Sequence, residues 1–159
     1  MAAAAGDFPA GYGHTFVKLW DVKTGKVVRI VAGPCGAFTF VAFSPDGKLL
    51  LTQQEWGGEK PGIFVHNIQT DKTDRVYKLH AAQPFAAAFS PDSRLAASCD
   101  GNGDVHVWDP LTGQNKRVIV LNTQWGTKQV FWAPDGRHLI VWNEIGTVYI
   151  LRLAPAPGG

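Results

Sequence analysis

Apolar residues lie in short runs along the chain, separated by residues that form turns. Residues 38–43 are apolar on both faces, 44–47 read Ser-Pro-Asp-Gly, and 49–53 return as a second run. Proline fixes φ for such a turn, and glycine tolerates its last position. Two further runs follow at 63–66 and 75–79. No segment keeps the three- and four-residue apolar spacing of a helix, so the pattern predicts four strands and almost no helix.

The same four-strand unit recurs along the chain. We name its strands A, B, C and D in order. The third unit is complete, at residues 85–89, 95–99, 105–108 and 116–120. The first unit supplies three strands at 1–5, 16–20 and 27–31, and the last supplies three at 128–132, 139–142 and 148–153. The pattern therefore predicts strands in the order BCD, ABCD, ABCD, ABC.

Three sets of sequence markers keep the period of these units. Strand C ends at Trp20-Asp21, His66-Asn67, Trp108-Asp109 and Leu151-Arg152, at intervals of 46, 42 and 43 residues. The Phe-Ser-Pro-Asp-Gly segment at 43–47 returns in related form at 89–93 and 132–136, and Thr-Gly-Lys at 24–26 returns similarly at 70–72 and 112–114. A period of about 40–45 residues with a Trp-Asp signature is typical of the four-stranded blades of a β-propeller.

These motifs resemble the WD40 repeat family over residues 1–153, and most of all its bacterial arrays, which are often attached to serine/threonine protein kinases. The resemblance implies an all-β propeller arc of about four blades that serves as a non-catalytic scaffold for a protein or peptide partner. One alternative is an accessory or sensor propeller of a multidomain signalling protein such as a serine/threonine kinase. Another is a propeller that binds calcium or a small ligand. Residues 154–159 form a tail rich in proline and glycine.

The strand order also predicts an incomplete or open ring. Closing the four blades on themselves would leave one A position and one D position empty. We therefore expect a fragment or half of a larger propeller. Open blade edges and uncovered blade faces favour association, so self-association is a further expectation.

The resemblance implies a hydrogen-bonded set inside each blade: a His before strand A, a Ser or Thr in strand B, an Asp in the B–C turn and a Trp in strand C. The third blade supplies His80, Ser98, Asp100 and Trp108. The other blades depart from the set, with Gly33-Pro34 at the His position and His66 and Leu151 at the Trp position. A half-satisfied buried network costs stability, so we expect those blades to be held mainly by apolar packing.

Loops that join B to C and D to A project from one face of a propeller. Two B–C loops, at 6–13 and 55–62, are longer than a turn needs, and the D–A loop at 122–126 lies on the same face. Together they carry Phe8, Tyr12, Trp56 and Trp125. Aromatic residues on loops of a rigid scaffold are typical of partner surfaces. The alternative is that these rings fold back as local caps on neighbouring blades.

The sequence gives little support for a metal site or a catalytic site. Asp100, Asn102 and Asp104 place oxygen side chains at alternate positions as calcium loops do, but Val105 and Leu111 stand where such a loop needs Gly and Glu. A plain turn is the favoured interpretation. The five histidines do not have the spacing of a metal motif: His14, His66, His80, His106 and His138. Without a nucleophile elbow, a His-Glu-x-x-His or a Walker sequence, we expect no cofactor, no metal and no enzyme.

Composition limits which partners and which cellular location we expect for the chain. The net charge of the 159 residues is +2 and the basic residues are scattered, so we expect no nucleic-acid partner. No run approaches the roughly 18 apolar residues of a membrane span, and the first residues lack the basic region of a signal peptide. Cys35 and Cys99 fit buried free thiols better than a disulfide. We therefore expect one domain in the cytoplasm, without a membrane partner.

Overall fold

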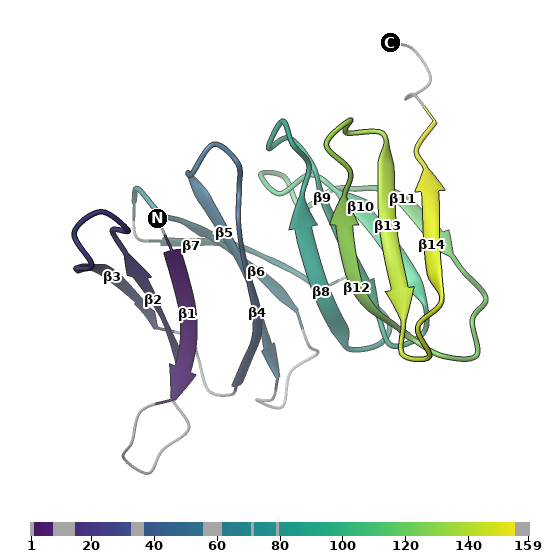
Figure 1. Cartoon of the computed structure of the whole chain (residues 1–159), viewed down its shortest axis with the longest axis horizontal. Helices are drawn as coiled ribbons and strands as arrows, with labels where there is room; N and C mark the ends of the chain where they lie inside the picture. The colour runs from purple at the N-terminus through teal and green to yellow at the C-terminus, as the bar shows by residue number, and fades with distance from the viewer. Residues whose placement is uncertain are drawn as a thin grey trace.

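The computed structural model of the chain describes residues 2–7, 15–32, 37–55, 62–70, 72–78 and 80–154, and its strands form four antiparallel sheets (Figure 1). The first sheet is β1 (Ala2–Asp7), β2 (Thr15–Trp20) and β3 (Val27–Ala32). The second is β4 (Ala37–Phe43), β5 (Leu49–Glu55), β6 (Ile63–Asn67) and β7 (Lys72–Tyr77). The third is β8 (Pro84–Phe89), β9 (Ala96–Asp100), β10 (Asp104–Trp108) and β11 (Asn115–Val120). The fourth is β12 (Thr127–Trp132), β13 (His138–Asn143) and β14 (Val148–Arg152).

Each sheet is one blade, and the order BCD, ABCD, ABCD, ABC is confirmed. Figure 1 shows the blades side by side in chain order, with the purple first blade and the yellow-green fourth blade at opposite ends of the row. The described residues thus form an open arc. Among them, no helix is long and apolar enough to cross a membrane.

Some strand boundaries differ from those predicted. Strand β7 begins at Lys72 rather than at residue 75, because Lys72 pairs with Asn67 directly after the turn. The first three residues of β7 are polar, so the apolar pattern did not predict them as part of a strand. Gly6, Asp7 and Glu55 were expected in loops but extend the ladders of β1 and β5.

The Asp that follows strand C has a defined role in the turn. The Asp21 carboxylate accepts the backbone N–H groups of the residues two and three positions ahead, at 2.7 and 3.2 Å. Asn67 and Asp109 accept the equivalent pairs at 2.8–3.1 Å. A short side chain with an oxygen at this distance replaces backbone partners in a tight turn. The Trp-Asp period therefore marks a turn in each of these three blades.

The Ser-Pro-Asp turns repeat a second geometry. The Ser44 hydroxyl donates to Asp46 at 2.6 Å and accepts the N–H of Leu49 at 2.9 Å. Ser90 in the third blade makes the same two bonds at the same distances. In both turns the serine hydroxyl holds the pKa of its aspartate below the ordinary value. Each turn closes the A–B hairpin of its blade through side chains.

The core lies between the blades. In each blade, alternate residues face opposite sides of the sheet, as the two-residue period of a strand requires, and a side that meets a neighbouring blade is buried. Between the second and third blades these buried residues are Leu49, Leu51, Ile63, Val65, Tyr77, Ala87, Phe89, Ala96 and Trp108. Similar clusters join the first blade to the second and the third to the fourth. The arc is thus held by three interfaces of sheet on sheet.

Candidate functional site: a loop face above a buried polar chain

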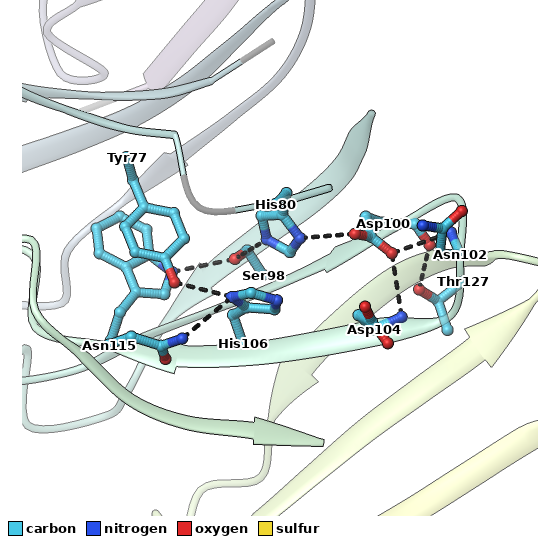
Figure 2. Close-up of polar contacts among 10 residues, drawn as sticks. Tyr77, His80, Ser98, Asp100, Asn102, Asp104, His106, Asn115 and Thr127 are labelled. Carbon is cyan, nitrogen blue, oxygen red and sulfur yellow. Dashed lines mark hydrogen bonds and ion pairs between the residues drawn. The ribbon is translucent and has the colours of Figure 1, made fainter. Parts of the chain in front are cut away.

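The third blade brings its four predicted polar residues together (Figure 2). His80 precedes β8, Ser98 lies on β9, Asp100 ends β9 and Trp108 ends β10. His80 Nδ1 is 3.0 Å from Asp100 Oδ2, and His80 Nε2 is 2.6 Å from Ser98 Oγ. Trp108 Nε1 donates to the same Ser98 oxygen at 3.1 Å. All four residues are buried. We refer to them as the polar chain.

The ionised carboxylate of Asp100 sets the direction of these bonds. Burial alone would raise the pKa of Asp100, but hydrogen bonds from His80 and from the N–H groups of Asp104 and Asn102 hold it below the ordinary value. An ionised carboxylate can only accept, so His80 Nδ1 carries the proton. In the neutral ring, His80 Nε2 then accepts from the Ser98 hydroxyl. Each of these polar atoms has a partner, which is the condition under which a buried network stabilises.

Ser98, His80 and Asp100 have the connectivity of a catalytic triad but not its access. The Ser98 and Asp100 residues are 0% exposed, and His80 is 4% exposed. A nucleophile must reach a substrate carbonyl, and Ser98 Oγ already accepts the Trp108 N–H. This arrangement can tie strands together; it cannot attack a substrate from solvent.

Two further residues extend the polar chain toward the second blade. The Tyr77 ring stacks on Trp108 at 4.2 Å between centroids, and its hydroxyl lies 2.9 Å from His106 Nδ1. The His106 ring lies 4.1 Å from the ring of His80. Burial, with the nearby His80, lowers the pKa of His106 to about 4, and burial raises the pKa of Tyr77 above its ordinary range. The sequence motif missed both residues because it describes contacts within a blade, and Tyr77 belongs to the preceding one.

Shorter polar contacts occupy the same positions in other blades, beside the apolar clusters that were expected to be their main support. By strand register, Thr52 corresponds to Ser98 and His66 to Trp108. Thr52 Oγ1 lies 2.8 Å from His66 Nε2. In the fourth blade, Asn143 stands at the Asp100 position and accepts the N–H of Thr147 at 2.8 Å. The sequence could have indicated this contact, because a hydroxyl on strand B and a polar ring on strand C can hydrogen-bond to each other when both replace the usual residues.

The D–A loop at 121–126 rests on the B–C turn of the third blade. The N–H of Leu121 donates to the Gly103 carbonyl at 3.4 Å, and the Thr127 hydroxyl donates to the Asp100 carbonyl at 2.8 Å. A Cβ on Gly126 would overlap the backbone of Gly101, so the two backbones meet in close contact. We call the surface formed by this loop and the adjoining B–C turns the loop face. Its loop is fixed from both ends.

Trp125 projects from this loop and is 50% exposed. The Thr123 hydroxyl donates to the Trp125 carbonyl, which ties the loop backbone to itself at this residue. On the same face, Lys128 Nζ lies 4.0 Å from the centroid of Phe85 and 3.5 Å from Glu144 Oε1. Of the four predicted surface aromatics, Phe8, Tyr12 and Trp56 lie outside the described residues. Trp125 is the one that the structure places.

The candidate calcium residues form a turn. Asp100 Oδ1 accepts the N–H groups of Asn102 and Asp104, each at 3.0 Å, while Oδ2 faces His80. Both carboxylate oxygens of Asp100 therefore already face donors. Burial and the Asp100 charge raise the pKa of Asp104, which disfavours its ionised form. Within the described ranges, no group of three or more His, Cys, Asp or Glu residues could hold a metal ion.

Comparison with known proteins identifies the repeat. Residues 71–109 match the family model WD40, described as "WD domain, G-beta repeat". Autophagy-related protein 16 of Arabidopsis thaliana is 33% identical over 142 residues, covering 83% of this chain and 26% of that protein. Nuclear distribution protein PAC1 of Arthroderma benhamiae is 30% identical over 142 residues, covering 82% and 30%. WD repeat and SOCS box-containing protein 1 of Xenopus tropicalis is 28% identical over 100 residues, covering 62% and 23%. The chain spans about a quarter to a third of the length of these relatives.

Proposed function

The chain belongs to the WD40 repeat family, and we propose that it is a non-catalytic scaffold that binds a protein or peptide partner on its loop face. The observation that carries the proposal is Trp125, a half-exposed indole on a loop whose backbone is locked to the third blade. Large aromatic side chains dominate the binding energy of interfaces.

Rigidity makes this residue suited to binding. A loop that is already ordered avoids most of the ordering entropy that association otherwise costs. The indole combines apolar area with one N–H donor, so it can enter a pocket and still satisfy a polar partner. Lys128 and Glu144 lie on the same face and would supply the polar rim that surrounds such an anchor.

Several finer points belong to this proposal. The chain is part or half of a larger WD40 propeller, which its short span relative to its relatives supports. An accessory role in a signalling protein such as a serine/threonine kinase is the alternative, and it rests on resemblance alone. A cytoplasmic location is supported by Cys99, a buried free thiol whose pKa burial raises to about 12.

A peptide-display selection against the folded chain tests the binding proposal. Peptides selected on the wild-type chain are measured again on Trp125→Ala and on the control Leu111→Ala. Leu111 is an exposed apolar residue in a C–D turn of the third blade. We expect Trp125→Ala to weaken binding by about tenfold or more, as removal of an aromatic anchor does, and Leu111→Ala to leave it unchanged. Equal affinity of all selected peptides for wild type and Trp125→Ala would discard the loop face.

A further inference from the structure

The fourth blade has an uncovered apolar face on the side away from the third blade. We call it the outer face; it comprises Phe131, Ile140, Trp142, Val148 and Ile150. Ile150 is 71% exposed and Val148 is 56% exposed. The rings of Phe131 and Trp142 lie against each other with centroids 5.2 Å apart. Solvent-exposed apolar side chains gathered on one sheet face are typical of an interaction surface.

Strand register shows what this face resembles inside the same chain. Val148 corresponds to Ile63 in the second blade and Val105 in the third. Ile150 corresponds to Val65 and Val107 by the same pairing. These four counterparts are 0–3% exposed, because each is covered by the blade that follows it. The outer face therefore has the composition and position of a surface that another blade covers.

The interface between the second and third blades shows what such a covering blade presents. There, Ile63 and Val65 share a buried cluster with Trp108, which ends strand C of the following blade. Trp20 holds the Trp108 position in the first blade, at the end of β2. Unlike Trp108, which is fully buried, Trp20 is partly exposed to solvent. Within the described residues, the exposed outer face and the partly exposed Trp20 of β2 thus lie at opposite ends of the arc (Figure 1).

We propose that the outer face binds a second copy of this chain, head to tail, with the first blade of one copy covering the fourth blade of the other. The contact repeats the sheet-on-sheet packing already present three times within the chain. Such an interface is heterologous, so it closes into a ring or continues into an open assembly according to its rotation. This association uses a different surface from the loop face and does not depend on partner binding there.

The primary experiment is sedimentation velocity over protein concentrations from about 1 to 100 µM, which brackets micromolar association. The test variant is Ile150→Lys and the matched control is Leu111→Lys, which changes an apolar residue of similar exposure, 66% against 71%, away from the outer face. We expect wild type and Leu111→Lys to associate as the concentration rises. Burying an unpaired ammonium is costly, so Ile150→Lys should associate on the order of 100-fold more weakly. A wild-type chain that stays monomeric, or an Ile150→Lys variant that associates like wild type, overturns the proposal.

Cysteine cross-linking tests the head-to-tail geometry separately. The head-to-tail contact keeps the two outer faces of a pair apart, so Ile150→Cys alone should give no covalent dimer under an added oxidant beyond the wild-type level. An equal mixture of Ile150→Cys and Trp20→Cys should give a covalent heterodimer. Covalent dimers of Ile150→Cys alone would show that two outer faces meet and would overturn the head-to-tail arrangement. The measurement on Ile150→Cys alone remains informative even if the Trp20→Cys variant fails to fold.

Discussion

Removing the Ser98 hydroxyl tests whether the polar chain stabilises the third blade. Ser98→Ala deletes one oxygen atom and leaves the backbone of β9 unchanged. That oxygen is 2.6 Å from His80 Nε2 and accepts the Trp108 N–H at 3.1 Å. In the variant, one acceptor and one donor therefore lose their partner. The orphaned acceptor and donor lie beside Ser98 and Trp108, which are both 0% exposed. Bulk water therefore does not replace the lost bonds.

The magnitude follows from these two orphaned groups. Each buried polar atom left without a partner costs about 1–3 kcal/mol, so Ser98→Ala should lower the free energy of unfolding by about 2–6 kcal/mol. That is a large part of the roughly 5–15 kcal/mol by which a domain is stable. The control is Ser90→Ala in the same blade. Ser90 donates to the exposed carboxylate of Asp92, which water can solvate again, and it accepts the N–H of Leu95 in a partly buried turn. We therefore expect a smaller loss of about 1–2 kcal/mol.

Urea unfolding of wild type and both variants measures these costs at a concentration at which the chain is monomeric. Circular dichroism and tryptophan fluorescence must give coincident transitions before a free energy is assigned. A double variant, Ser98→Ala with Trp108→Phe, adds a second check. Because the orphaned indole N–H is then also removed, Trp108→Phe should cost about 1 kcal/mol less in the Ser98→Ala variant than in the wild-type chain. A Ser98→Ala cost no larger than that of Ser90→Ala, at an unchanged m-value, would refute the reasoning.

Three further predictions concern single positions. Folding lowers the pKa of His106 from about 6.5 to about 4. Its contribution to the free energy of unfolding should therefore be complete above pH 6.5 and fall by about 3 kcal/mol as the pH drops toward 4. His106→Gln should flatten that pH dependence when unfolding is measured in urea. Gly126→Ala should lower the melting temperature, because a Cβ overlaps the Gly101 backbone; an unchanged melting temperature contradicts the close contact. Ser93 has φ of 62°, so Ser93→Gly should stabilise by about 0.5–1 kcal/mol in the same assay despite losing its bond from the Asp46 N–H; destabilisation would contradict this.

The architecture was predictable because its information is local and repeated. Two-residue alternation, the Ser-Pro-Asp turns and the Asp after strand C each act within a few residues, and their recurrence in exact or related form reinforced the period. The structure supplies the reason for the last marker, since Asp21, Asn67 and Asp109 each hold two turn N–H groups. The polar start of β7 was missed for the same reason, because its pairing is set by the turn before it and not by an apolar pattern.

The sequence repeat could not predict the contacts between side chains of different blades. Tyr77 and His106 lie 29 residues apart in different blades, and nothing in either local sequence requires their bond. Their meeting depends on how far one sheet turns relative to the next, which strand pattern does not encode. Thr52 and His66 are different: they lie on paired strands two register positions apart, so a rule that accepted any hydroxyl and any polar ring would have found them.

The polar chain and the exposed Trp125 are parts of one structure. Asp100 is held by His80, and its own backbone carbonyl accepts the hydroxyl of Thr127. Thr127 directly follows Gly126, which packs on the backbone of Gly101. The bonds that close the third blade thus also fix the loop that carries Trp125. A change at Ser98 should therefore loosen that loop as well as the blade, and hydrogen exchange at the N–H of Leu121 should quicken in Ser98→Ala more than in Ser90→Ala. Equal exchange in the two variants would show that the loop face is held independently of the polar chain.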